Sequence, residues 1–368
     1  MAKLNKIATY MTFASLLAAI VLWVLGSESI LGIPIIGFLV CLAISIRAHA
    51  FLKGLSFTIL IFAAVAAALF YPSLFTSIGG FNLKKLIVPL LMIIMFGMGT
   101  AMSFKDFVGV VKMPKGVIIG ILCQFSIMPF VGYALARVSN LPPEIAAGII
   151  LVGCSPSGLA SNVMSFISKS NLALSLTLTA IATLLAPILT PLLMKLLANQ
   201  LVPIDFIAML LSISKIVILP ILLGLLFNHF FKGKFTWLDE AMPIISMAGI
   251  ALIITIITAA GRDALLTIGL TLIVIVLVHN LLGYFLGYGL GRFFGLDKKS
   301  ARTVAFEVGM QNGGLASGIA LEMGRVATMG LAPAVFGPMM NITGSSLAAW
   351  WRGKPVNNSD QTEEKESS

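Results

Sequence analysis

The chain has 368 residues, of which 59% are hydrophobic and only 10% are charged. Soluble domains carry roughly 25% charged residues, so this composition excludes a soluble globular protein and indicates a protein of the lipid bilayer. The net charge is +10, but the basic residues fall between apolar stretches and form no patch for a nucleic acid. The apolar stretches are long and continuous, which favours helical spans over the short alternating strands of a membrane β-barrel.

Twelve apolar stretches are expected to span the bilayer as helices. The first is longer than the apolar part of a signal peptide, so we expect it to remain as an uncleaved span. The stretches cover residues 7–25, 33–46, 55–71, 86–102, 116–136, 145–167, 172–197, 206–227, 241–260, 265–290, 301–321 and 326–350. The residues that follow are polar, and their composition predicts a disordered tail.

The distribution of basic residues predicts the orientation. Twelve spans place both termini on one side of the membrane, and most of the lysines and arginines then lie on that same side. The positive-inside rule makes this side the cytoplasm. We therefore expect a multi-pass protein of the cell membrane with both termini cytoplasmic.

The sequence Gly-Leu-Ala-Ser occurs twice, once from Gly158 and once from Gly314. When the two copies are aligned in the sequence, Gln124 corresponds to Asn280. Both residues carry a side-chain amide, and each lies in the span before its copy. If the first two spans are set aside, five spans precede residue 199 and five follow it. Because five is an odd number, the two units enter the membrane from opposite faces, which is the inverted repeat common in secondary transporters.

These observations predict the domain organisation of an all-α polytopic membrane protein. We expect two additional N-terminal spans in residues 1–50, a first five-helix repeat in residues 51–199, a second, inverted repeat in residues 200–352 and a polar cytoplasmic tail in residues 353–368. The Gly, Ser, Pro and Asn residues near both copies of the repeated sequence weaken a helix. A helix broken at membrane depth survives where it is buried in protein or lines a wet cavity, and there it can bind ions and substrates.

Three strings carry a resemblance to a known family: GCSPSGLASNVMS, ALSLTLT and FEVGMQNGGLASG. They resemble the bile acid:sodium symporter family, bacterial members included, and the similarity runs from about residue 55 to residue 351. The resemblance implies a core domain and a panel domain built from ten helices, with two broken helices that cross in the core. It also implies the import of an organic anion together with sodium by alternating access. The first two spans are additional to the ten helices of the family.

The resemblance further implies two sodium sites. The first would use the side chains of Ser161, Asn162, Ser175, Thr179 and Glu307. The second would use Gln124, Glu307 and Gln311 together with the backbone carbonyls of Val308 and Met310. Hydroxyl, amide, carbonyl and carboxylate oxygens are hard ligands of the kind that sodium requires.

Each of these residues also has a simpler interpretation. Glu307 could complement a helix dipole, although a carboxylate inside a span is costly without a partner and indicates a function. Ser175 and Thr179 could bond the backbone of their own helix, and Gln124 could hold two helices together. Their combination favours a cation site.

The resemblance points to a substrate region near Leu159, Asn312 and Asn341. Members of the family often carry a hydroxyl residue where this chain has Leu159 and a histidine where it has Met340. The two asparagines match the family. The implied substrate is a bile acid-like molecule or a small carboxylate such as pantoate.

An enzyme is not expected, because the sequence contains no HExxH, no GxSxG and no clustered His/Asp pair. The expected partners are sodium, a small organic anion and the lipid bilayer, without nucleic acid and without an obligate protein partner. The alternative is a sodium/proton antiporter that uses Glu307 as its proton carrier.

Overall fold

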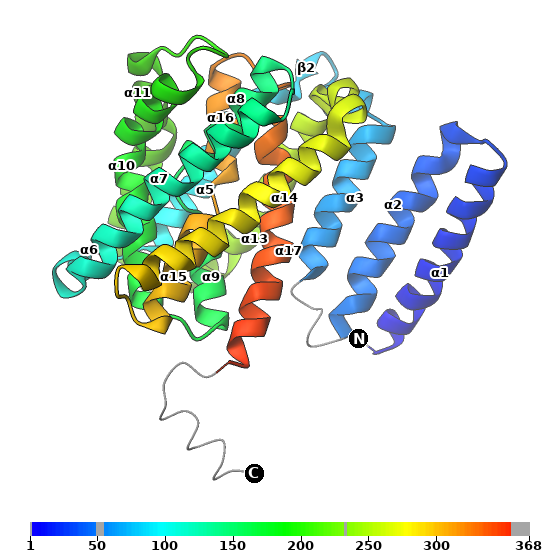
Figure 1. Cartoon of the computed structure of the whole chain (residues 1–368). Coiled ribbons are helices and arrows are strands. Elements are labelled where there is room, and N and C mark those ends of the chain that lie inside the picture. Colours follow the sequence, from blue (N-terminus) through cyan, green and yellow to red (C-terminus); the bar gives the residue numbers. More distant parts are fainter. Residues whose placement is uncertain (1, 49–54, 232–233, 355–368) are drawn as a thin grey trace.

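The computed structural model describes residues 2–48, 55–231 and 234–354, and these residues are almost entirely helical (Figure 1). The first half contains α1 (Ala2–Val24), α2 (Glu28–Ser45), η1 (Ile46–Ala48), α3 (Ser56–Phe70), α4 (Ser73–Thr76), β1 (Ser77–Ile78), β2 (Phe81–Asn82), η3 (Leu83–Leu86), α5 (Ile87–Ala101), α6 (Phe104–Lys112), α7 (Pro114–Val138), α8 (Pro143–Cys154), α9 (Ala160–Ile167) and α10 (Leu172–Ala198). The two strands form a short antiparallel hairpin.

The second half is helical throughout. It contains α11 (Phe206–Ile213), the π-helical segment η4 (Ser214–Ile218), α12 (Leu219–Phe231), α13 (Thr236–Ala260), α14 (Arg262–Phe293), α15 (Lys298–Gly309), α16 (Gly313–Glu322) and α17 (Leu331–Arg352). Eight helical segments of the described residues are long and apolar enough to cross a membrane. The prediction of an all-α polytopic membrane protein is confirmed.

Each of the twelve predicted stretches contains a helix or a pair of helices. Residues 145–167 hold the pair α8 and α9, and residues 301–321 hold the pair α15 and α16, so both pairs are interrupted near their middle. The structure also contains α6, which was not predicted from the sequence. In α6 the Ser103 amide donates a hydrogen bond to the Asp106 carboxylate, as part of a capping box that starts the helix. The predicted tail lies outside the described residues except for Gly353 and Lys354.

Most helices belong to one of two groups, between which lies the cavity described below. A small group consists of α3, α5, α12 and α13, in which α12 packs on α5, α5 on α13 and α13 on α3. A large group consists of α7, α8, α9, α10, α14, α15, α16 and α17. The beginning of α1 and the end of α17 lie on the same side of the molecule (Figure 1).

Glycines let two helices of the large group approach closely. A Cβ atom at Gly283 of α14 would lie 3.0 Å from the Cα atom of Gly309, and one at Gly287 would lie 3.1 Å from the Cα atom of Ala305. Larger residues at these two positions would push α15 away from α14. The glycines of α14 therefore position the helix that carries Glu307.

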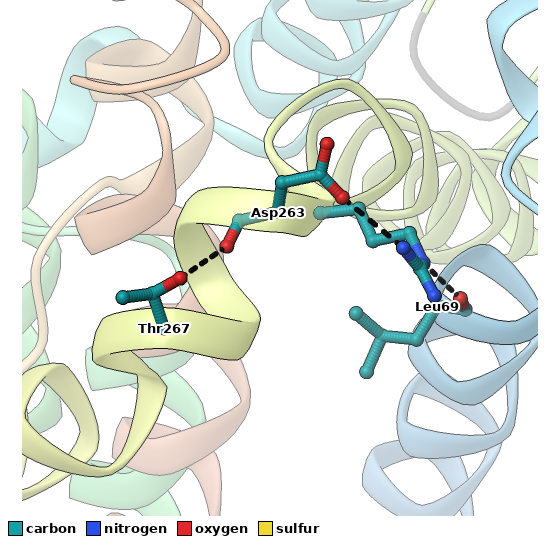
Figure 2. A network of polar contacts seen from close by, with 4 residues as sticks. Leu69, Asp263 and Thr267 are labelled. Atoms are coloured by element: carbon teal, nitrogen blue, oxygen red, sulfur yellow. Dashed lines mark hydrogen bonds and ion pairs between the residues drawn. The ribbon is translucent and has the colours of Figure 1, made fainter.

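The side chain of Arg262 links the small group to the beginning of α14. Its Nε atom donates a hydrogen bond of 2.6 Å to the Leu69 carbonyl in the last turn of α3, and its Nη1 atom lies 3.1 Å from Asp263 (Figure 2). A cationic group at the carboxyl end of a helix satisfies a free carbonyl and complements the helix dipole. This contact fixes the end of α3, and residues of the first two turns of the same helix line the cavity.

The first two helices lie at the edge of the molecule (Figure 1). The main contacts of α1 are with α2 and η1, and α2 in turn packs on α3. The polar contacts across this boundary are few: the Ser56 hydroxyl bonds the Ala43 carbonyl, and Arg47 bonds the Ser56 hydroxyl. The rest of the fold therefore does not depend on α1 and α2 for its packing.

We predict that a chain beginning at residue 51 still inserts and folds, because removing two helices preserves the topology of the others. The loss of these few contacts should lower the melting temperature by no more than about 5 °C. Thermal unfolding of the purified truncated protein, compared with the full chain, measures this. A well-expressed truncated chain that aggregates or unfolds much earlier would show that α1 and α2 are part of the folding unit.

Candidate functional site

Two helix interruptions face each other in the middle of the large group. α8 ends at Cys154 and α9 begins at Ala160, while α15 ends at Gly309 and α16 begins at Gly313. From the sequence, the interruptions were expected at the two Gly-Leu-Ala-Ser copies. The structure places the first interruption at residues 155–159, which include Gly158 and Leu159, because Pro156 has no N–H to continue α8. The second interruption lies just before its copy, because the Asn312 side chain caps the start of α16.

The two interruptions are joined backbone to backbone. The Gly158 amide donates to the Met310 carbonyl at 3.0 Å, and the Asn312 amide donates to the Pro156 carbonyl at 2.8 Å. Ser157 and Gln311 therefore pair as in a short antiparallel bridge. Two carboxyl-terminal helix ends and two amino-terminal helix ends meet here, so partial charges of both signs are concentrated at one place.

Glu307 lies at the centre of a group of oxygen atoms that we call the carboxylate nest. Its members are Ser157, Ser161, Asn162, Ser175, Thr179 and Glu307, which come from both interrupted pairs and from α10. Only 1% of the Glu307 surface is exposed. The hydroxyls of Ser161 and Ser175 each lie 2.6 Å from its Oε1 atom, and the hydroxyls of Ser157 and Thr179 lie 2.6 Å and 2.9 Å from its Oε2 atom.

The nest has fewer hydroxyl protons than short oxygen–oxygen contacts, with four protons for seven contacts. The hydroxyls of Ser175 and Thr179 also lie 2.8 Å and 3.1 Å from the Asn162 amide oxygen, and the Ser161 hydroxyl lies 2.8 Å from the Gly158 carbonyl. Each hydroxyl has a single proton to donate but further lone pairs that accept. Four hydroxyl protons thus serve the carboxylate, an amide oxygen and a carbonyl. Such an arrangement is suited to a cation, which accepts electron density from every oxygen at once.

No lysine, arginine or histidine among the described residues forms an ion pair with Glu307. Arg302, five residues earlier on α15, is buried but donates to the carbonyls of Trp351 and Lys354 at the end of α17. The negative charge of an ionised Glu307 would therefore lack a protein countercharge, which is costly inside a membrane protein.

A second polar group lies next to the nest. The Gln124 amide nitrogen donates to the Gln311 side-chain oxygen and to the Ser155 carbonyl, both at 2.9 Å, and the Gln311 amide donates to the Val308 carbonyl. The Gln124 side-chain oxygen is buried and has no hydrogen-bond partner among the described residues. A buried acceptor without a donor is a position at which a cation could bind.

Asn280 occupies the position in α14 that Gln124 occupies in α7. Its amide donates to the Gly309 carbonyl at 2.8 Å, at the end of α15, just as Gln124 donates to the Ser155 carbonyl at the end of α8. Each amide therefore satisfies a free carbonyl where a helix is interrupted. The sequence correspondence between Gln124 and Asn280 is matched by this shared role.

A cavity of about 380 Å³ lies beside the two interruptions. Helices α3, α5 and α13 of the small group form one wall, and α17 together with the first turns of α9 and α16 forms the other. Leu159, Asn312 and Asn341, the three predicted substrate residues, all line it, and so does Met340. None of the residues lining this cavity carries a charge, and the Asn341 side chain makes no hydrogen bond with another described residue.

The structure brings the predicted residues together in two adjacent groups. Ser161, Asn162, Ser175 and Thr179 surround Glu307, while Gln124 and Gln311 bond each other and the Met310 carbonyl accepts from Gly158. Glu307, predicted to serve both groups, makes its hydrogen bonds within the first.

Two polar residues of this region were not predicted from the sequence. Ser157 belongs to the nest, and its place beside Pro156 in the weakened segment was a usable signal. Thr343 donates its hydroxyl proton to Asn280, a contact across 63 residues that no local pattern indicates.

Comparison with known proteins adds independent information. The profile of the Sodium Bile acid symporter family matches residues 88–268. The uncharacterized sodium-dependent transporter YocS of Bacillus subtilis is 40% identical over 310 residues, which cover 84% of this chain and 94% of that protein.

Two chloroplast proteins, both named probable sodium/metabolite cotransporter BASS1, are also similar. The protein of Oryza sativa subsp. japonica is 35% identical over 73% of this chain and 66% of its own length. The protein of Arabidopsis thaliana is 36% identical over 71% of this chain and 65% of its own length. These relatives are transporters and not enzymes. With its interrupted helices and its buried carboxylate, the chain belongs to the sodium bile acid symporter family.

Proposed function

We propose that this protein imports a small organic anion together with sodium ions by alternating access. The observation that carries the proposal is the carboxylate nest: a buried Glu307 surrounded by four hydroxyls and an amide oxygen, with no protein cation paired with it among the described residues. Sodium supplies the missing positive charge and accepts hard oxygen ligands of this kind. The sodium-dependent relatives support this identification of the ion.

The nest is the first sodium site in this proposal. Each hydroxyl keeps its proton directed at an acceptor and turns a lone pair toward the ion. The second site is formed by Gln124, Gln311 and the carbonyls of Val308 and Met310. Glu307 directly precedes Val308 in the chain, so its charge acts on both ions. The unpaired Gln124 oxygen supports this second position.

The substrate binds in the cavity between the two groups of helices. Its volume of about 380 Å³ lies near the lower end of the roughly 300–1,000 Å³ typical of ligand pockets, which favours a small carboxylate such as pantoate over a bile acid. Because none of the described residues that line the cavity is charged, the carboxylate would be held by the first turn of α16, at Gly314, and by the amide of Asn341.

The small group corresponds to a panel domain and the large group to a core domain. The inverted repeat of residues 51–199 and 200–352 relates the two interrupted pairs, and the parallel roles of Gln124 and Asn280 support that relation. Movement of the core against the panel would open the cavity to each side in turn. The charge distribution supports cytoplasmic termini in the cell membrane.

We predict that Glu307→Gln abolishes sodium-dependent uptake in proteoliposomes and lowers sodium affinity by about 100-fold, because the ion loses its only charged ligand. Uptake is measured at fixed pH with an imposed sodium gradient. The probe is the carboxylate that most stabilises the purified protein in a thermal-shift panel containing pantoate and a bile acid. Glu322→Gln is the matched control, since Glu322 lies at the far end of α16 and is exposed.

Normal sodium stimulation in the Glu307→Gln protein would exclude the nest as a sodium site. Sodium flux that is driven by an opposing proton gradient, in the absence of any carboxylate, would instead support the sodium/proton antiporter, in which Glu307 carries a proton.

We also predict that sodium and substrate strengthen each other's binding by the same factor, since coupling between two sites is reciprocal. Thr179→Val keeps the shape of the side chain but removes a hydroxyl ligand, so it should weaken sodium binding by about tenfold and reduce the coupling. Asn341→Ala should weaken substrate binding by a similar factor while sodium alone still stabilises the protein. Calorimetric titrations of each ligand, with and without the other, measure the sodium affinity, the substrate affinity and the factor by which each ligand strengthens the other.

Substrate affinity that does not depend on sodium in the unmutated protein would contradict this coupling. Loss of the stabilisation by sodium in the Asn341→Ala protein would contradict it as well, because the two sites would then not be separable.

A further inference from the structure

Three helices of the large group form a polar seam that leads away from the carboxylate nest. α9, α10 and α15 contact one another pairwise, and each carries polar residues at helical spacing. These residues are Ser161, Ser165 and Ser168 on α9 and its end, Glu307, Thr303 and Ser300 on α15, and Ser175 on α10 with Asn171 one turn before it. Residues four and seven apart lie on one face of a helix, so three polar stripes meet along the seam.

The seam is buried from the nest to Ser300, and Asn171 is half-buried. Ser165 and Thr303 are completely buried, as are the nest residues Ser161 and Ser175, and Ser300 is only 6% exposed. With a rise of 1.5 Å per residue, the seven residues from Glu307 to Ser300 span about 10 Å. The seam therefore connects the nest with the end of the molecule at which α17 ends.

Ser165 lies one turn from Ser161, between the nest and that end. Its hydroxyl is buried and has no hydrogen-bond partner among the described residues, whereas serines in helices usually bond a carbonyl of the preceding turn. The Thr303 hydroxyl lies at the corresponding height on α15, one turn from Glu307. An unpaired buried hydroxyl beside a cation site is a free oxygen ligand.

Polar contacts continue to the end of the seam. The Asn171 amide donates to the Ser300 hydroxyl at 3.2 Å, and the Thr303 hydroxyl donates to the Asn171 carbonyl at 3.0 Å. Beyond them lies Asp297, an exposed carboxylate that accepts from the Ser300 hydroxyl and amide. Burial raises the pKa of Asp297, but these hydrogen bonds outweigh it and leave the pKa below its usual value. The carboxylate of Asp297 thus lies at the exposed end of the seam, next to Lys298 and Lys299 in the chain.

We propose that this seam is the passage through which sodium leaves the nest toward the cytoplasm, with Ser165 and Thr303 as intermediate ligands. The inference rests on the proposed sodium site at Glu307. Sodium would move from the nest to the Ser165 and Thr303 hydroxyls, about 6 Å away by helical rise, and then to the oxygens around Asn171 and Ser300. The substrate cavity lies on the other side of the interruptions, so the ion and the anion would leave by separate routes.

A silver ion tests the passage, because it is a monovalent cation that reacts with a thiol wherever it can reach one. Ser165→Cys is made in a chain whose three cysteines, Cys41, Cys123 and Cys154, are replaced by alanine. Silver is added to inside-out or right-side-out membrane vesicles, and free thiol is then measured after denaturation. We expect capture of the thiol from the cytoplasmic side, slowed by sodium and not by potassium. Ser126→Cys, on the exposed face of α7, is the control and should show no effect of sodium.

A thiol at position 165 that silver does not reach, or reaches equally fast with and without sodium, would overturn the passage. In parallel, Ser165→Ala should lower turnover about tenfold while sodium affinity changes by less than about twofold; unchanged turnover would also count against it. Sodium-specific thermal stabilisation of the unmutated protein separates the two proposals. If sodium stabilises the unmutated protein, failure of silver to react with the thiol at position 165 excludes only the passage. If sodium does not stabilise it, both the sodium site and the passage are excluded.

Discussion

The structure depends on one electrostatic constraint, the burial of the Glu307 carboxylate in a membrane protein without a described protein cation to neutralise it. An isolated charge in such an environment costs many kcal/mol, so its surroundings must stabilise it. Four hydroxyls do so partially, and they come from segments far apart in the chain: Ser157 and Ser161 before and in α9, and Ser175 and Thr179 in α10. In the proposed function, sodium neutralises the remaining charge, and its binding to the folded protein would then raise the stability of that protein.

The interrupted helices are the means by which backbone and side chains reach the carboxylate. A continuous α8–α9 helix would turn Ser157 and Gly158 into ordinary helical positions, with no free backbone to pair with Gln311 and Met310. Instead the two interruptions satisfy each other, and the amides of Gln124 and Asn280 satisfy the carbonyls that remain at the two helix ends. The cavity is lined by the opposite helix ends, the first turns of α9 and α16. In the proposed function the ion and the anion would share this crossing point, and ordering it by either ligand would favour binding of the other.

Much of the fold could be predicted from hydropathy, because each apolar stretch was long and bounded by polar residues. The two interruptions were located to within a few residues by Gly, Pro and Asn. The second Gly-Leu-Ala-Ser copy lies in the first turn of α16, whereas the first copy spans the end of its interruption and the start of α9. The grouping of Ser161, Asn162, Ser175 and Thr179 around Glu307 followed from a family resemblance rather than from spacing. Ser157 stands beside Pro156 in a visibly weakened segment, but its bond to Glu307, 150 residues away, is seen only in the structure. The same holds for the Ser165 hydroxyl, which has no hydrogen-bond partner among the described residues.

The central claim is that the nest binds sodium because its carboxylate lacks a countercharge. Calorimetric titration of the purified, unmutated protein with sodium in the absence of any substrate, beside a matched titration with potassium, measures this most directly. We expect saturable binding of sodium and no saturable heat with potassium. No saturable heat with sodium, or the same heat with both ions, would contradict the claim.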